Sequence, residues 1–189
     1  MNNQISVVIA TKKLSKDLLK TINSINRQSY FPKEIIIVSN IKILKKFNLN
    51  KEIILKKFTS KVKNQVFQRN IAIKNLSKKS HLILQLDDKI ILDKNCLYEL
   101  NKFWKEASSS TIGVGLNQIN KSDNKGLFNR LINRFYKLKG KVLSNGMIID
   151  YSSVYKDLEV MWLKGGLSSW RIKNNKDIYN RKYPLWHWS

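Results

Sequence analysis

The chain has 189 residues, of which 42% are hydrophobic, enough for one domain of ordinary size with a single core. Its 36 lysines and arginines against 13 acidic residues give a formal net charge of +23, which favours a polyanionic partner: a phosphorylated substrate, a nucleic acid or an anionic membrane. The single cysteine, Cys96, excludes an intrachain disulfide, and with His81 and His187 as the only histidines it does not make a zinc site.

The start of the chain lacks the pattern of a signal peptide, and no apolar run approaches the roughly 18 residues of a membrane span. Together with the cysteine usage, this predicts a cytoplasmic protein. Cys96 is interpreted as a small core residue, with a reactive nucleophile as the alternative.

Strands and helices are expected to alternate from the beginning of the chain. The β-branched run at residues 5–10 predicts a first buried strand. Ser15 is a candidate N-cap for an amphipathic helix, and Pro32 is expected to stop that helix. Residues 34–38 predict a second strand and residues 53–55 a short third. The apolar face of the first helix is expected to contain Leu18, Leu19, Ile22 and Ile25.

The alternation continues with a helix at residues 66–76, an apolar run at residues 81–92 and a strand at residues 112–116. Alternating elements of this length predict an α/β fold, with a mostly parallel central sheet covered by helices on both faces. The helix at residues 66–76 is expected to turn Ile71, Ala72 and Leu76 toward the core. A further amphipathic helix is expected between the apolar run and the strand at residues 112–116, and its apolar residues are Leu97, Leu100, Phe103 and Trp104.

Asp87 and Asp88 interrupt the apolar run HLILQLDDKIIL at residues 81–92. Such a run indicates a strand buried in a parallel sheet, and ligands of open α/β sheets collect beyond the carboxyl ends of these strands. Two adjacent like charges are tolerated there if they are solvated or if they hold a cation, and a hard divalent ion on phosphate oxygens suits them. The alternative is a solvated turn.

Several short motifs follow one another in a characteristic order. They are ISVVIATKK, LLKTINSINRQSY, FPKEIIIVSN, NQVFQRNIAI, LILQLDDKI and WLKGGLSSWR. In this order they resemble the glycosyltransferase family 2 domains of the GT-A fold, over nearly the whole chain. The resemblance implies one GT-A domain at residues 1–189, with a nucleotide-sugar-binding half at 1–92 and an acceptor-side half at 93–189.

The resemblance also implies a nucleotide diphosphate sugar as donor, an inverting transfer to a hydroxyl of a glycan or lipid-linked acceptor, and Mg²⁺ or Mn²⁺ on the pyrophosphate. A divalent cation stabilises the charge of the departing diphosphate, while a base takes the proton of the incoming hydroxyl. The resemblance assigns donor binding to Ala10, Thr11, Lys12, Ser39, Asn40, Arg69, Asp87, Asp88 and Lys89.

Two of these positions depart from the family pattern. Ser39 and Asn40 stand where the second strand usually ends in an aspartate, and they can hydrogen-bond but carry no charge. Lys89 stands where the family has its last acidic metal ligand, and an ammonium cannot ligate a metal. Either Asp88 or Asp87 holds the ion with phosphate and water, or Lys89 itself supplies the positive charge. Arg69 is expected at the diphosphate, with an ion-paired or solvated helix residue as the alternative.

The acceptor side is less complete. The resemblance assigns Gly165, Gly166, Trp170 and Arg171 to the border of the acceptor site, where a tryptophan face can stack on a sugar ring. The family places its base in an acidic pair beyond the Gly-Gly segment, and we expect this chain to stop before that pair. The remaining candidates for a base are Asp177 and His187.

Residues 125–141, KGLFNRLINRFYKLKGK, predict a basic amphipathic helix. This helix either covers the sheet or lies on the anionic inner face of the cell membrane.

Three function classes follow from the sequence: an inverting glycosyltransferase, a nucleotide-sugar-binding module without turnover, and a basic nucleic-acid binder. The last is supported by charge alone, without an aromatic-rich or helix-turn-helix pattern.

Overall fold

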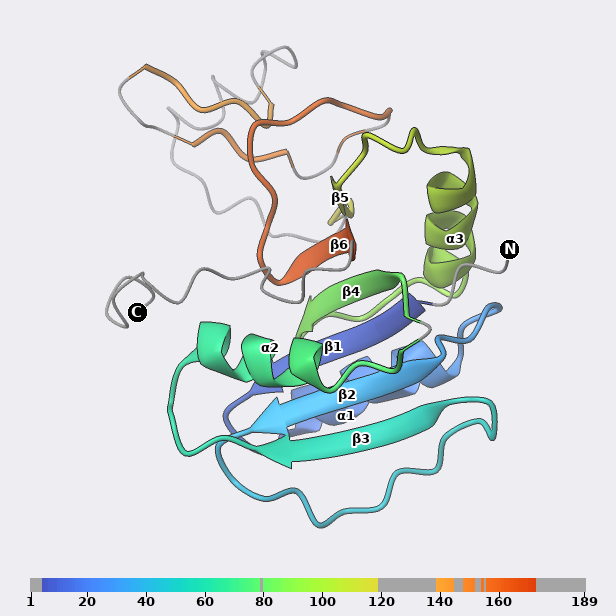
Figure 1. The fold of residues 1–189 in the computed structure, drawn as a ribbon, viewed down its shortest axis with the longest axis vertical. Coiled ribbons are helices and arrows are strands. Elements are labelled where there is room, and N and C mark those ends of the chain that lie inside the picture. Colours follow the sequence, from blue (N-terminus) through green and yellow to red (C-terminus); the bar gives the residue numbers. More distant parts are fainter. Residues whose placement is uncertain are drawn as a thin grey trace.

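The computed structural model describes residues 5–78, 80–118, 139–144, 148–151, 154 and 156–172. In this part of the chain a six-stranded sheet has the strand order β3-β2-β1-β4-β6-β5 (Figure 1). The elements are β1 (Ile5–Thr11), α1 (Lys16–Asn26), β2 (Glu34–Ser39), β3 (Ile54–Thr59), α2 (Gln65–Lys74), β4 (Leu82–Asp87), α3 (Cys96–Glu106), β5 (Gly113–Gly115) and β6 (Leu167–Arg171).

The sheet is mostly parallel, as expected. β3, β2, β1 and β4 run parallel, β6 runs antiparallel to β4, and β5 runs antiparallel to β6. β1 and β4 lie in the interior of the sheet and are mostly apolar, because a parallel strand covered on both faces buries the side chains of both faces. β6 is a strand that the sequence did not predict.

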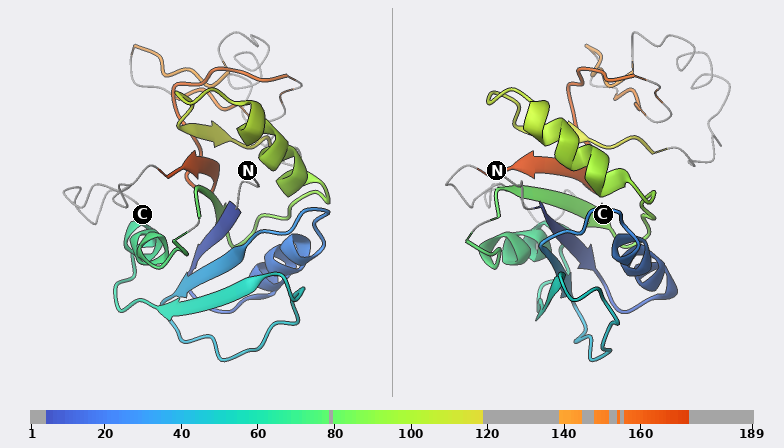
Figure 2. Two further views of the ribbon diagram at one scale, coloured as in Figure 1. Left: turned by 45° about the vertical axis from the view of Figure 1, so that its right-hand side comes forward. Right: turned by 90° about the vertical axis from the view of Figure 1, so that its right-hand side faces the viewer.

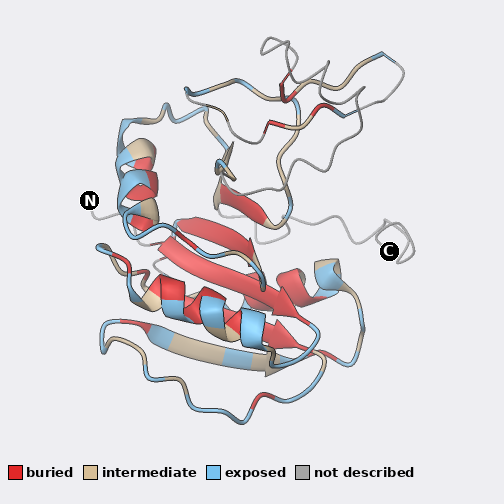
Figure 3. Ribbon diagram, turned by 180° about the vertical axis from the view of Figure 1, so that it is seen from behind, coloured by how far each residue is buried: buried red, intermediate tan, exposed pale blue. Residues whose placement is uncertain are grey.

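Helices cover both faces of the sheet, which confirms the predicted layers (Figure 2). α1 and α3 contribute to the larger core on one face, together with alternate residues of β1, β2 and β4. α2 packs on the other face, where Ala72 contacts a smaller cluster formed by Val8, Ile36 and Val38. Figure 3 shows that β1, β2 and β4 are buried, whereas β3 at the sheet edge is partly exposed.

The limits of the helices follow from local hydrogen bonds. The Ser15 side chain caps α1 by accepting a bond from the Leu18 N–H at 3.0 Å, as predicted. α1 ends at Asn26, so the prediction that Pro32 stops it is wrong. Its end is set by the Arg27 N–H, which bonds to the Ile25 carbonyl, and by the chain reversal that follows.

Two elements differ in extent from the predictions. β3 runs from Ile54 to Thr59 instead of 53–55, because it pairs with the whole length of β2. Its Lys57 Nζ also donates to the carbonyls of Ile43 at 3.0 Å and Lys45 at 3.2 Å. α2 ends at Lys74, before the predicted Leu76; of the expected inward residues Ala72 is buried, and Ile71 and Leu76 pack partly buried against the same cluster, to which the structure adds the buried Ile73. No helix in the described ranges is long and apolar enough to cross a membrane. Residues 125–138 of the expected basic helix lie outside the described residues.

A buried carboxylate holds the amino-terminal edge of the sheet. Glu34 is 0% exposed and accepts hydrogen bonds from the hydroxyls of Ser6 at 2.7 Å, Ser77 at 2.8 Å and Ser80 at 3.0 Å. Lys56 Nζ lies 2.7 Å from the same carboxylate. Burial by itself raises the pKa of a carboxyl group, but Lys56 and the hydrogen bonds outweigh it and lower the pKa of Glu34 to about 2.

Candidate functional site

The carboxyl ends of β1, β2 and β4 meet at one edge of the sheet (Figure 1). In the strand register Ala10 is opposite Asp87, and Thr11 is opposite Ser39. The sequence placed donor-binding residues at the ends of separate strands, and the parallel register brings these strand ends together. This edge is where open α/β sheets bind ligands.

Thr11 connects the end of β1 to the acidic pair. Its Oγ1 lies within hydrogen-bonding distance of Asp88 Oδ2 and, at 3.1 Å, of the Lys13 carbonyl. A hydroxyl has one proton, so Thr11 donates to one of these two acceptors at a time. Thr11 is 4% exposed and Asp88 is half-buried, while Lys12 is exposed beside them. Thr11 thus fixes the direction of the Asp88 carboxylate.

Gln68 of α2 connects the carboxyl ends of β1 and β2 through hydrogen bonds. It is 3% exposed, and its Nε2 donates to the Thr11 carbonyl at 2.9 Å and to Asn40 Oδ1 at 3.2 Å. Sequence reasoning missed this residue. The available signal was a glutamine immediately before Arg69 on the face of a helix that packs on the sheet. Its role is to hold the carboxyl ends of β1 and β2 in a fixed relation.

Ser39 and Asn40 reach the predicted edge, but their side chains bond within the protein. The Ser39 hydroxyl donates to the Ile41 carbonyl at 2.7 Å. Asn40 Nδ2 donates to the carbonyls of Ser60 at 3.2 Å and Val62 at 2.9 Å. The two residues therefore stabilise the turn after β2, and Asn40 joins that turn to the segment after β3.

Asp87 is held from the helix side. Arg69 Nη2 lies 3.1 Å from Asp87 Oδ1, and Gln65 Nε2 donates to the same oxygen at 2.9 Å. The Arg69 side chain is 8% exposed, whereas that of Asp87 is 47% exposed. Arg69 is thus an ion-paired helix residue in this structure, one of the two readings that the sequence left open. The pair presents a carboxylate whose orientation is set by two donors.

The Gly-Gly segment lies directly against this pair. The Asp87 N–H donates to the Gly166 carbonyl at 2.8 Å, and a Cβ on Gly166 would overlap the Asp87 carboxylate. A Cβ on Gly165 would lie 3.2 Å from Arg69 Nη1. Glycine is needed at Gly166 because the backbone approaches a charged side chain too closely for any other residue.

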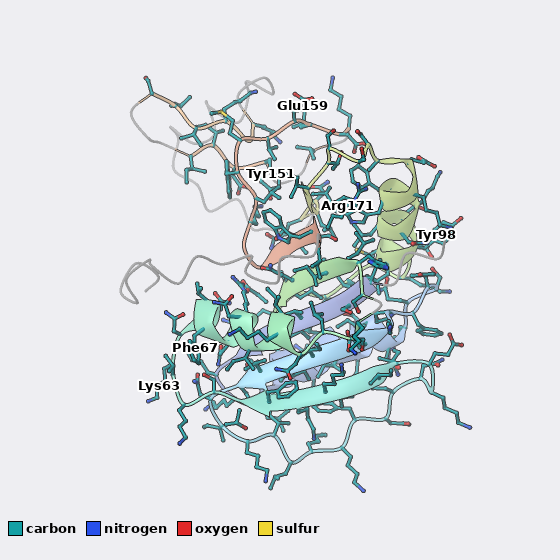
Figure 4. All side chains as sticks on the ribbon, viewed as in Figure 1. Lys63, Phe67, Tyr98, Tyr151, Glu159 and Arg171 are labelled. Atoms are coloured by element: carbon teal, nitrogen blue, oxygen red, sulfur yellow. The ribbon has the colours of Figure 1, made fainter. Side chains whose placement is uncertain are left out.

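Trp170 and Arg171 lie at the opposite end of β6 from the glycines. Arg171 pairs with Leu82 at the start of β4, and Trp170 with Ile83, whereas Gly166 meets Asp87 at the end of β4. Antiparallel pairing of β6 with β4 carries these two residues away from the acidic pair. The Arg171 guanidinium lies 5.1 Å above the Trp104 ring, beside α3 (Figure 4).

Trp170 instead lines a cavity of about 700 Å³ beside β5. Its Nε1 donates to the Ser168 hydroxyl at 2.9 Å, and its ring lies close to Gly113. Tyr151 and Glu159 also line this cavity and are labelled in Figure 4. The structure thus separates the expected acceptor-side residues into two glycines at the acidic edge and two residues at the other end of the strand.

The acidic pair has the chemistry to bind Mg²⁺ or Mn²⁺, and neighbouring side chains decide which of the two carboxylates is available. Mg²⁺ is commonly held by one or two carboxylates together with substrate phosphates and waters, and Asp87 and Asp88 are two adjacent carboxylates. Oδ1 of Asp87 is already engaged by Arg69 and Gln65, so Asp88 is the better placed ligand. Within the described ranges, no group of three or more His, Cys, Asp and Glu side chains converges on one point.

Lys89 extends from the same turn and is exposed. Among the described residues, no carboxylate forms an ion pair with it. Lys89 is the next residue after the two carboxylates, and Lys12 is the next residue after β1, whose carboxyl end lies at the same edge. The edge therefore combines a carboxylate pair with two exposed lysines, which is suited to phosphate oxygens.

The other sequence candidates lie elsewhere. Burial raises the pKa of the Cys96 thiol to about 11, with a further contribution from nearby Asp93. A thiol with that pKa is protonated at neutral pH, which agrees with the interpretation of Cys96 as a packing residue. The base candidates Asp177 and His187 lie outside the described residues.

Comparison with known families agrees with the geometry of the edge. The model of the family described as Glycosyl transferase family 2 matches residues 6–157. The chain belongs to glycosyl transferase family 2. This match covers β1 to β5 and both strand ends that carry the acidic pair and Thr11, and it confirms the resemblance seen in the motifs. No curated protein matches the sequence.

Two solved structures are reported for comparison with this family 2 chain. S. aureus TarS 1-349 in complex with UDP-GlcNAc is 18% identical with a TM-score of 0.47, and the match covers 66% of this chain and 36% of that one. The 4-diphosphocytidyl-2C-methyl-D-erythritol synthase of Anaerococcus prevotii DSM 20548 is 14% identical with a TM-score of 0.47, over 90% of this chain and 70% of that one. The chain thus spans little more than a third of the TarS structure.

Proposed function

We propose that this family 2 chain is an inverting glycosyltransferase that moves a sugar from a nucleotide diphosphate sugar to a hydroxyl of a glycan or lipid-linked acceptor, in polysaccharide biosynthesis. One observation carries the proposal. The Thr11–Asp88 contact and the Arg69–Asp87 ion pair converge at the carboxyl edge of the parallel strands. That edge, in a chain of this family, is suited to a phosphorylated ligand.

The proposed reaction is a single displacement. The acceptor oxygen forms a bond to the anomeric carbon while the bond from that carbon to the diphosphate oxygen breaks, and the bonding electrons leave with the diphosphate. The acceptor proton passes to a base, for which Asp177 and His187 remain the sequence candidates.

In this proposal the described residues bind and orient the donor. Lys12 and Lys89 are exposed cations beside the acidic pair and are proposed to contact the diphosphate. Asp88, oriented by Thr11, and secondarily Asp87 would hold Mg²⁺ or Mn²⁺, which when bound neutralises charge on the departing diphosphate. Arg69 keeps Asp87 in place, and Gly166 lets the segment before β6, on the proposed acceptor side, lie directly against this pair.

Calorimetric titration with a panel of nucleotide diphosphates and their sugars tests donor binding. We expect a uridine or guanosine diphosphate to bind, and Asp88→Asn to weaken that binding by at least about 10-fold through lost orientation or ion binding. Asp17→Asn is the matched control, because Asp17 is an exposed carboxylate on α1. A folded protein that binds none of these nucleotides contradicts the proposal.

A nucleotide-sugar-binding module without turnover is the second candidate. The observation that favours it is the engagement of Asp87 by Arg69 together with a lysine, Lys89, in place of an acidic ligand. Transfer of labelled sugar to mixed glycan and lipid acceptors separates the two candidates, since the module binds donor but forms no product. A nucleic-acid binder has only the net charge of +23 in its favour.

A further inference from the structure

A second feature of the fold lies beside the candidate site and is not used by it. Residues 41–46, with the sequence IKILKK, follow β2 after the single residue Asn40 and are called the 41–46 loop. Two of its aliphatic side chains are largely exposed, Ile41 at 60% and Leu44 at 76%. Its three lysines, Lys42, Lys45 and Lys46, are exposed as well. Aliphatic and cationic side chains therefore alternate along one short exposed segment.

The backbone of this loop is fastened to the sheet. Ile43 is 6% exposed and belongs to the larger core. Lys57 Nζ donates to the carbonyls of Ile43 at 3.0 Å and Lys45 at 3.2 Å. Ile43 is thus anchored inward, while its neighbours Lys42 and Leu44 are exposed. Ile41 and Leu44 therefore lie on a segment whose backbone is held against the protein.

Further cations adjoin the loop. Asn40, the residue before Ile41, bonds to the carbonyls of Ser60 and Val62, which brings the segment after β3 alongside. Lys61 and Lys63 are exposed there, and Phe67 at the start of α2 is 42% exposed. Figure 4 shows Lys63 and Phe67 at the edge of the molecule, near the end of β3 and the start of α2. No acidic residue occurs at positions 40–51 or 53–86, so these cations are not neutralised by nearby carboxylates in the sequence.

We infer that the 41–46 loop docks the protein on an anionic lipid surface. Ile41 and Leu44 enter the boundary between headgroups and acyl chains, and Lys42, Lys45 and Lys46 contact the lipid phosphates. A surface that joins exposed aliphatic side chains to lysines gains from both parts of such a membrane, by burial of apolar area and by attraction to anionic headgroups. The inference goes beyond the proposed function, because docking requires no transfer.

The same residues fit a nucleic acid less well. Non-specific binding of single strands relies on aromatic side chains that stack on bases, whereas the two outward apolar residues of the 41–46 loop are aliphatic. Exposed isoleucine and leucine gain nothing from a phosphate backbone. The loop begins directly after Asn40, which lies at the same sheet edge as the acidic pair, so docking would bring that edge close to the lipid surface.

The test is cosedimentation of the full chain with vesicles of phosphatidylcholine alone and of phosphatidylcholine mixed with phosphatidylglycerol. We expect binding to the mixed vesicles only, weakening as salt is raised. Replacing Lys42, Lys45 and Lys46 by Gln should lower the partition coefficient on the order of 100-fold, since each lysine near such a surface contributes roughly 5-fold. The double variant Ile41→Ser with Leu44→Ser should lower it roughly 10-fold.

Matched controls lie elsewhere on the surface. Ile112→Ser removes an aliphatic side chain that is 62% exposed, and Gln at Lys94, Lys102 and Lys105 removes three exposed lysines. The partition coefficient of Ile112→Ser should stay within about 3-fold of that of the original chain. That of the triple lysine variant should stay within about 10-fold, because this variant also loses net charge. Thermal unfolding and nucleotide titration of every variant should remain as in the original chain, which separates this inference from the donor site.

Several outcomes overturn the inference. One is equal binding to neutral and anionic vesicles, or no binding to either. Another is that vesicle binding falls when the loop lysines are replaced but not in the double serine variant. That result would show that the loop attracts polyanions without inserting aliphatic side chains into the lipid. Tighter binding to a mixed-sequence oligonucleotide, with the same dependence on the loop lysines, would identify a nucleic acid as the partner instead.

Discussion

Gly166 lies against the carboxylate of Asp87, so closely that a side chain on Gly166 would occupy the same space. The Asp87 N–H also donates to the Gly166 carbonyl at 2.8 Å. The connection between β6 and the acidic pair is thus a direct backbone contact. Any change at Gly166 must displace the carboxylate that Arg69 and Gln65 hold in place.

We therefore expect Gly166→Ala to displace Asp87 and to lower affinity for a nucleotide diphosphate by at least about 10-fold, with a loss of unfolding free energy of about 1 to 3 kcal/mol from overpacking. Calorimetry and denaturant unfolding measure the two effects. Gly165→Ala is the control, because its added carbon meets only the flexible end of Arg69, at 3.2 Å. Equal behaviour of the two variants would contradict the close-contact argument.

Lys89 distinguishes two ways of balancing the charge of the diphosphate. If its ammonium supplies that charge, donor binding should survive a metal chelator and fall by about 10-fold in Lys89→Ala, the effect of one charge-assisted hydrogen bond. Titration with and without EDTA measures this, and Lys94→Ala serves as an exposed control. Binding that is abolished by EDTA and unchanged in Lys89→Ala would show instead that Asp88 binds a metal ion.

The Thr11 hydroxyl should matter through Asp88. Thr11→Val keeps the shape of the side chain but leaves Asp88 Oδ2 without this donor, at a cost of about 1 to 3 kcal/mol if the group stays buried. We expect donor affinity to fall several-fold in Thr11→Val and to be largely kept in Thr11→Ser, which retains the hydroxyl. The measurement is again nucleotide titration. An equal loss in both variants would assign the effect to packing of the methyl group rather than to the hydrogen bond.

Glu34 should make stability depend on pH in the acid range. Its pKa is lowered from 4.5 to about 2 in the folded chain, so its stabilising contribution is present above the unfolded value and is lost as the pH falls from about 4.5 toward 2. Glu34→Gln should be less stable at neutral pH by on the order of 3 kcal/mol, and the difference from the original chain should shrink as the pH falls through this window.

Denaturant unfolding at a series of pH values measures that difference. Glu52→Gln, at an exposed carboxylate, is the control and should track the original chain at every pH. A difference between Glu34→Gln and the original chain that stays constant down to the lowest pH would mean that the carboxylate charge is not what stabilises this edge.

The sequence by itself determined the order of the elements and the position of the acidic pair. β1, β2 and β4 are mostly apolar segments of strand length, and Ser15 caps α1 as expected, because such signals depend on residues close together in the chain. The motif order also identified the family that the comparison confirms over residues 6–157.

Only the tertiary structure decided what surrounds the acidic pair. β6 was not predicted, since its small and polar residues have no strong strand pattern and its partner β4 lies far away in the sequence. That antiparallel pairing brings Gly166 to Asp87 and takes Trp170 and Arg171 to the other end of the sheet. The link from Gln68 to Thr11 and Asn40 likewise depends on how α2 packs across β1 and β2. Pairing register and helix packing arise from long-range contacts, which local sequence patterns do not encode.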